Sequence, residues 1–149
     1  MEGWVLHLHL IAAISWIGGS VFMFVLGVTL RDKKVQKQVY PHVGPIFGWF
    51  EVGSLVVLLA TGIMLGVNYS LFSQLFVDGS LAISDAVTKK FILVVVLTIV
   101  TIVHFIIAYK TNNTGRTKLE HMISRASSML IFFLNLFVMH YGIVLRNIL

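Results

Sequence analysis

The sequence predicts an all-α integral membrane protein, an antiparallel bundle of four transmembrane helices. Of its 149 residues, 58% are hydrophobic and 11% are charged, whereas an average soluble domain contains about 25% charged residues. Four stretches contain no Asp, Glu, Lys or Arg: residues 3–30, 52–77, 91–109 and 126–145. A helix needs about 20 apolar residues to cross the hydrocarbon of a bilayer. The solvent of this chain is therefore lipid.

Each charge-free stretch predicts one membrane helix. In lipid every backbone N–H and C=O group must be satisfied within the structure, and the alternative, a closed barrel, requires alternating strands of about ten residues. The sequence shows no such strands. We expect helices over about 4–30, 45–69, 88–110 and 121–146. The connections are short and no internal repeat is present, so residues 1–149 form a single domain.

The first helix resembles a signal peptide only superficially. Glu2 stands where a signal peptide carries positive charge, and the apolar run is much longer than an h-region of about 7–15 residues. We expect this segment to remain as a helix. Small residues such as Gly18, Gly19, Gly62 and Gly66 allow neighbouring helices to approach closely.

Orientation follows from the distribution of cations. The first connection, residues 31–44, contains Arg31, Lys33, Lys34 and Lys37, and the third, residues 110–120, contains Lys110, Arg116 and Lys118. The positive-inside rule places both connections in the cytoplasm and both termini outside, in a bacterial cytoplasmic membrane. Lys89 and Lys90, at the start of the third helix, weakly favour the opposite orientation. The net charge of +5 predicts contact with anionic lipid headgroups rather than with nucleic acid, because the basic residues lie in short loops.

The absence of cysteine limits the possible metal chemistry. Without cysteine the chain has no disulfide, no cysteine-ligated iron–sulfur cluster, no thiolate zinc site and no covalent c-type haem. Any metal is held by His, Met or carboxylate groups.

The histidines separate by depth into two groups. At about 1.5 Å per residue, His9 lies about 7 Å and His140 about 9 Å inside the outer ends of their helices, so they share a level. His7 points about 200° away from His9 around the same helix. His104 lies about 8 Å from the inner end of its helix. Near this inner level are Glu51, His42, His121 and Arg125.

Depth also distinguishes ligands from interfacial residues. Ionisable groups about two turns inside the bilayer are costly and face the bundle interior, so His9, His104 and His140 are the candidate metal or haem ligands. His7, His42 and His121 near helix ends are typical of interfacial residues, although His42 and His121 remain possible partners for His104. Further polar or aromatic residues that share the inward faces are expected to support the site or to join helices: Trp16, Glu51, Lys90, Arg125 and Asn135.

The stretch LHLIAAISWIGGSVFM resembles the first helix of the copper resistance D (CopD) domain and of HemJ-type protoporphyrinogen oxidases. The second helix, GPIFGWFEVGSLVVLLATGIMLG, and a third helix that starts at lysine and carries a histidine continue this resemblance. It implies a four-helix scaffold with His9 as a ligand of b-type haem. The chain lacks the Arg-Leu-Phe and Arg-x-x-Asn-Glu-x-Pro motifs of HemJ-type proteins, so the resemblance does not extend firmly to the oxidase activity.

Three functions remain open. The first is electron transfer by one or two b-type haems. His9 and His140 would hold one haem, and His104 with His121 or His42 would hold a second. The redox partner of the protein would be a quinone, a porphyrin or another protein. The second is copper binding or transport through imidazole and thioether groups, here His7, His9, Met23, Met129, Met139 and His140. The third is a structural subunit of a homo-oligomer or larger membrane complex.

Overall fold

The predicted all-α architecture is confirmed by a computed structural model, which describes residues 2–77, 82–110 and 118–148. In these ranges the chain forms four long helices, α1 (Glu2–Thr29), α2 (Lys33–Asn68), α3 (Ala82–Lys110) and α4 (Lys118–Ile148), and the short 3-10 helix η1 (Leu71–Gln74). All four long helices have the length and apolar composition needed to cross a membrane. The protein is therefore a membrane protein.

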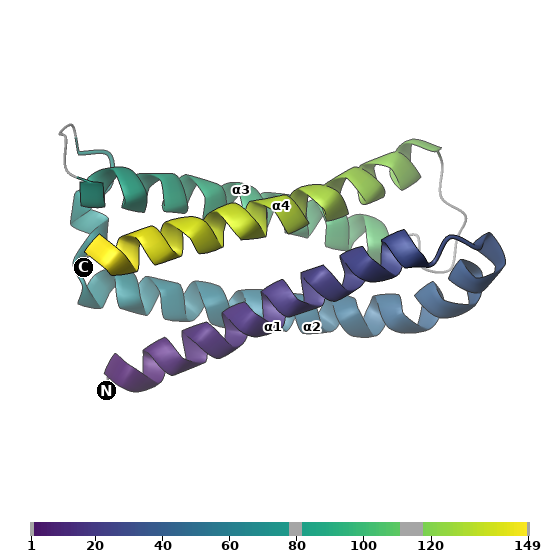
Figure 1. Cartoon of the computed structure of the whole chain (residues 1–149), viewed down its shortest axis with the longest axis horizontal. Coiled ribbons are helices and arrows are strands. Elements are labelled where there is room, and N and C mark those ends of the chain that lie inside the picture. The colour runs from purple at the N-terminus through teal and green to yellow at the C-terminus, as the bar shows by residue number, and fades with distance from the viewer. Residues whose placement is uncertain (1, 78–81, 111–117, 149) are drawn as a thin grey trace.

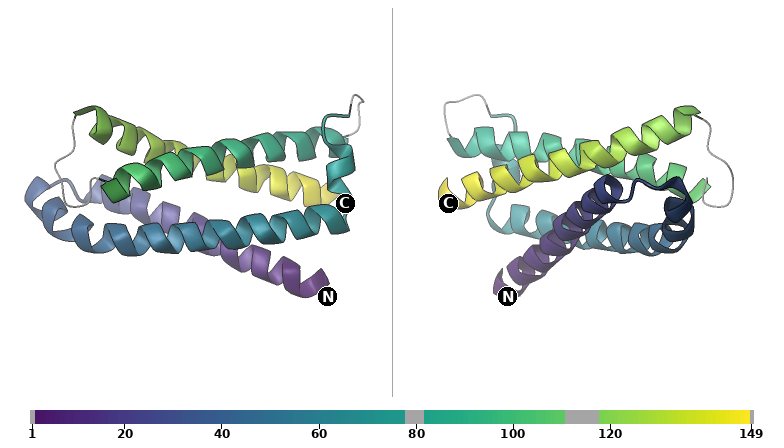
Figure 2. Two further views of the ribbon diagram at one scale, coloured as in Figure 1. Left: turned by 180° about the vertical axis from the view of Figure 1, so that it is seen from behind. Right: turned by 45° about the vertical axis from the view of Figure 1, so that its right-hand side comes forward.

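The four helices run antiparallel as two hairpins (Figure 1). α1 packs mainly on α2 and α3 mainly on α4, whereas contacts between the hairpins are fewer. Both chain termini lie at one end, here called the terminal end. The N-terminal turns of α1 diverge from the bundle there (Figure 2). The opposite end carries Arg31, Lys33, Lys34 and Lys37 and is called the cationic end.

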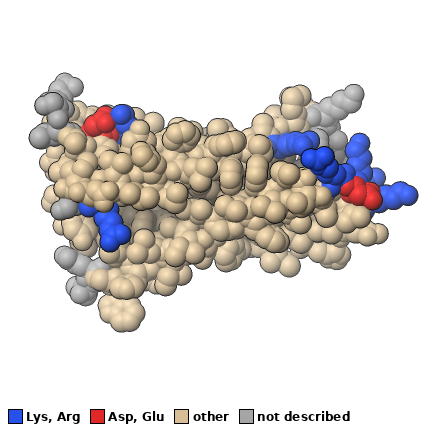
Figure 3. Space-filling view, in the orientation of Figure 1, with Lys and Arg blue, Asp and Glu red and all other residues tan. Residues whose placement is uncertain are grey.

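Lys and Arg side chains gather at the two ends and leave the middle of the visible face uncharged (Figure 3). Large apolar side chains cover the surface, whereas the interior of the described structure holds as many polar as apolar buried side chains. This distribution is the reverse of that in a water-soluble protein, because lipid rather than water covers the outside. The ion pair between Asp85 and Lys89, with 2.9 Å between Oδ2 and Nζ, lies on the surface near the terminal end.

The boundaries of α2 differ from the prediction, because the helix begins at Lys33 and not near residue 45. Most of the expected loop 31–44 is therefore helical. The Asp32 carboxylate caps the helix by accepting the Lys34 N–H at 2.9 Å, and the Gln36 side-chain amide donates to the Leu30 carbonyl. Pro41 and Pro45 lie inside the helix. Each loses one backbone hydrogen bond but has a φ angle compatible with helix.

α3 also begins earlier than expected, at Ala82 and not near residue 88. The Ser84 hydroxyl donates to the Gln74 carbonyl at 2.8 Å and so ties the first turn of α3 to η1. A hydrogen bond between two elements depends on the fold, which is why periodicity did not locate this boundary.

All four long helices contribute to the central hydrophobic core. Its buried members are Trp16, Leu55, Leu97, Ile131 and Leu134. Close packing of α1 on α2 requires glycine at one point: a Cβ added to Gly19 would lie 2.7 Å from Cε2 of Phe47. The core and this contact fix the rotation of each helix, and therefore which polar side chains face inward.

Candidate functional site

His9 is held in the bundle by a hydroxyl of α2. Its Nδ1 lies 2.8 Å from Oγ1 of Thr61, and Thr61 donates its own proton to the Val57 carbonyl at 2.6 Å. The hydroxyl therefore accepts the Nδ1–H of His9, which leaves the lone pair of a neutral imidazole on Nε2. A Cβ at Gly62 would lie 3.4 Å from Cε1 of the ring, so the small residue lets His9 approach α2 closely.

A cation from α3 accompanies His9. Lys90 interacts electrostatically with His9, and its Nζ would lie 3.5 Å from a Cβ at Gly142 of α4. All four long helices therefore meet at this level, called the terminal level and defined by His9, Thr61, Lys90 and Gly142. Lys90 has no ion pair with an acidic group in the described part of the chain.

A second polar group joins the two hairpins at mid-height. Nε1 of Trp16 donates to Oδ1 of Asn135 at 2.5 Å, and Nδ2 of Asn135 donates to the Ser20 hydroxyl at 3.0 Å. All three side chains are buried. The predicted hydrogen bond from Asn135 to a neighbouring helix is confirmed, and Trp16 is its partner.

His104 repeats the arrangement of His9 nearer the cationic end. Its Nδ1 lies 2.8 Å from the Ser127 hydroxyl, and that hydroxyl donates to the Ser124 carbonyl at 2.9 Å. Ser127 therefore accepts from His104, just as Thr61 accepts from His9. Each histidine is thus oriented by a hydroxyl on the other helix of its own hairpin.

Glu51 lies on the inward face of α2 and is 5% exposed. The sequence places Arg125 and His104 near the same level. Arg125 is exposed, and no ion pair links it to Glu51 among the described residues. The Nδ1 of His104 is oriented by Ser127. Glu51 is therefore a buried carboxyl that forms no ion pair among the described residues.

The other candidate histidines whose side chains the structure describes lie outside this interior. The His140 ring is exposed on α4 and stacks edge-on with Tyr141, with 5.4 Å between ring centroids. No hydrogen bond or ring contact joins it to His9 in the described structure. His42 is exposed on α2, and His7 is exposed and bonded to the Gly3 carbonyl. The side chain of His121 lies outside the described residues.

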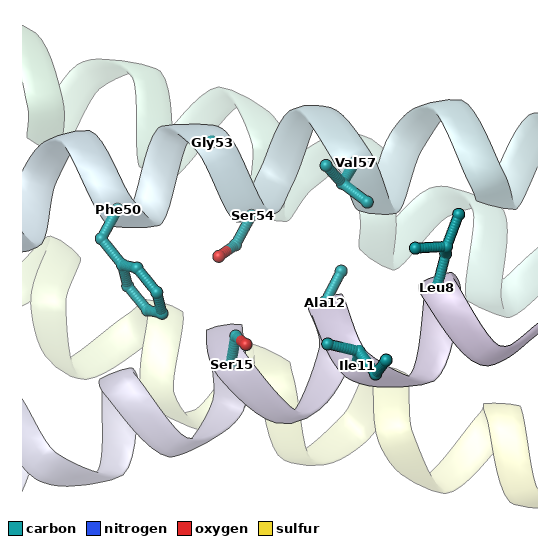
Figure 4. Close-up of a pocket in the computed structure, with 8 residues that line it drawn as sticks. All are labelled: Leu8, Ile11, Ala12, Ser15, Phe50, Gly53, Ser54 and Val57. Carbon is teal, nitrogen blue, oxygen red and sulfur yellow. The ribbon is translucent and has the colours of Figure 1, made fainter.

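A groove on the bundle surface separates α1 from α2 (Figure 4). Ser15 and Ser54 extend into it from opposite helices, and the rest of its lining carries no polar side chain. None of the predicted ligands lines the groove. Its lining residues are Leu8, Ile11, Ala12, Ser15, Phe50, Gly53, Ser54 and Val57.

The sequence analysis did not single out the hydroxyls that orient the histidines, Thr61 and Ser127. A hydroxyl on an inward helical face, at the depth of a histidine on another helix, is the signal that could have identified both. Gly62 and Gly142 lie at the terminal level, beside His9 and Lys90 respectively.

The candidate metal ligands can also be judged by whether their side chains lie close together. In the described structure no three His, Asp or Glu side chains converge as a metal site. Of the residues considered for copper, His7, Met129, Met139 and His140 are exposed and Met23 is half-buried. Among the described side chains, His9 and His104 are the two half-buried imidazoles, and each is oriented by a hydroxyl.

Comparison of the chain with protein-family models, with curated proteins and with solved structures finds no match.

Proposed function

We propose that this protein is a membrane-embedded b-type haem protein that transfers electrons, with His9 as an axial ligand. The observation that carries the proposal is the hydrogen bond from His9 Nδ1–H to Thr61. Histidines that bind metals characteristically donate the N–H of the second ring nitrogen to a fixed acceptor, which sets the tautomer and the ring orientation. The same arrangement at His104 supports the prediction of a second site.

The residues at the terminal level fit a haem in their donor chemistry. His9 would bind iron through Nε2, and Thr61 holds the ring in place. Lys90 supplies a positive charge near His9 that can pair with a porphyrin carboxylate in a medium of low dielectric constant. A bound haem supplies reversible one-electron chemistry, and its potential depends on the axial ligands and on burial.

The second axial ligand remains a prediction. Gly142 places this part of α4 beside Lys90, and His140 lies two residues earlier, at nearly the same level but about 200° around the helix. His140 stays the predicted partner of His9 on the ground of depth alone, since its side chain is exposed. His42 and His121 remain the predicted partners of His104. Copper binding has weaker support, because most of the donors it requires face outward.

An optical spectrum tests the proposal. Protein purified in detergent from haem-replete cells should show a Soret band and, after reduction by dithionite, a sharp α band. His9→Ala should abolish or strongly weaken the low-spin bands, and His7→Ala is the matched control because His7 lies exposed on the same helix. Thr61→Val, which removes the acceptor with little change of shape, should shift the bands while retaining haem.

Two results would reject the haem assignment. Wild-type protein without a Soret band would favour a structural subunit. An unchanged spectrum in His9→Ala would exclude His9 as a ligand. If instead the His140→Ala variant kept the wild-type bands, only the assignment of the second ligand would be wrong.

A further inference from the structure

Polar side chains from all four helices line the interior of the bundle at successive heights. The terminal level holds His9 and Thr61 in contact. Seven residues further along α1, about 10 Å deeper, Trp16 bonds Asn135. Asn135 in turn bonds Ser20, one more turn along the same helix. The polar groups therefore extend from the terminal level to the middle of the bundle.

Glu51 lies at the end of this series. Ser20 is 11 residues beyond His9 on α1 and Glu51 is 10 residues before Thr61 on α2. Because His9 and Thr61 are in contact, these counts place Ser20 and Glu51 at the same level, about 15 Å from the terminal level. Both residues are buried, with 7% and 5% of their surface exposed.

Polar groups continue beyond Glu51 towards the cationic end. The Phe105 ring packs edge-on against Trp49, with 5.8 Å between centroids, and would lie 3.5 Å from a Cβ at Gly48. This contact places His104, the neighbour of Phe105, within about two turns of Glu51. From there the bond between His104 and Ser127 continues the series.

Charged groups are sparse around Glu51. On α1 no Asp, Glu, Lys or Arg occurs between residues 3 and 30. On α3 the titratable side chains nearest in sequence to this level are Lys90 at the terminal level and His104 towards the cationic end. On α4 the nearest are Arg125, which is exposed, and His140, which is also exposed. A carboxyl at this depth without a cation beside it is costly, and such groups are characteristic of proton pathways.

We propose that the interior of the bundle conducts protons between its two ends and that Glu51 binds the proton midway. The carboxylate takes one proton from water-bridged polar groups on one side, becomes a neutral acid, and releases that proton to the other side. One positive charge crosses per cycle, and no oxidant or reductant takes part. The proposal stands independently of haem binding.

Proton uptake by vesicles tests this function. The purified protein is reconstituted into phosphatidylcholine–phosphatidylglycerol vesicles that contain pyranine, and valinomycin with a potassium gradient makes the interior negative. Without any electron donor, wild-type vesicles should acidify at least fivefold faster than protein-free vesicles. Glu51→Gln should reduce the rate to within twofold of protein-free vesicles. Asp85→Asn, which alters an exposed surface carboxylate, should keep the wild-type rate.

Chemical modification gives a second readout that needs no mutant to fold. Dicyclohexylcarbodiimide, an apolar reagent that modifies buried carboxyl groups, should label Glu51 in the wild-type protein and stop acidification in proportion to the labelling measured by mass spectrometry. Wild-type acidification no faster than that of protein-free vesicles would overturn the proposal. Folded Glu51→Gln with the wild-type rate, or undiminished flux after complete labelling of Glu51, would overturn it as well.

Discussion

Replacement of Asn135 by leucine should weaken the attachment between the two hairpins. Asn135 accepts from Trp16 at 2.5 Å and donates to Ser20 at 3.0 Å. Both bonds join α4 to α1, helices that otherwise share few contacts. Leucine has a similar volume but can form neither bond, so the variant tests the polar contribution with little change in packing.

The expected loss of stability comes from the two lost hydrogen bonds and from the indole N–H of Trp16, which is left without an acceptor. Hydrogen bonds between membrane helices contribute about 0.6 kcal/mol on average and at most about 1.7 kcal/mol, so two bonds give about 1.2 kcal/mol. Trp16 is 3% exposed, and a buried N–H without an acceptor costs about 1–3 kcal/mol. The free energy of unfolding should therefore fall by about 2–4 kcal/mol.

Unfolding in sodium dodecyl sulfate, followed by far-ultraviolet circular dichroism, measures this loss. Asn147→Leu is the matched control, since Asn147 is exposed near the end of α4, and should stay within about 0.5 kcal/mol of wild type. In a Trp16→Phe background the effect of Asn135→Leu should shrink by about 2–3 kcal/mol, because both the bond from Trp16 and the unpaired indole N–H are absent there. A loss below 0.5 kcal/mol, or strictly additive effects in this cycle, would refute the reasoning.

Two further predictions concern helix packing and sidedness. Gly19→Ala should lower the free energy of unfolding by about 1–3 kcal/mol, because its Cβ would lie 2.7 Å from the Phe47 ring. Gly18→Ala should be neutral, because a Cβ there meets no atom within 4 Å. Equal effects of the two substitutions in the same detergent assay would contradict this packing. A cysteine at position 34 should resist an impermeant maleimide in intact cells and one at position 147 should react. The opposite labelling pattern would invert the orientation predicted from the cations.

The sequence by itself determined the membrane environment, the four spans and the antiparallel order. These properties follow from a demand that acts on each segment separately, since a helix in lipid must be long, apolar and internally hydrogen-bonded. The depth of each polar residue could also be counted along its helix. For this reason His9 and Asn135 were recognised as interior residues before the arrangement of the helices was known.

The tertiary structure decided which of these residues meet. The partners of His9 and His104 are hydroxyls, Thr61 and Ser127, because helix rotation brings those faces together. That rotation depends on close contacts such as Gly19 against Phe47, which involve two helices at once. The early start of α2 at Lys33 is different, because the Asp32 cap and the bond from Gln36 to Leu30 are local and could have been recognised in the sequence. The hydropathy of a segment indicates whether lipid or water surrounds it, whereas the pairing of two helices depends on the shapes of both their surfaces.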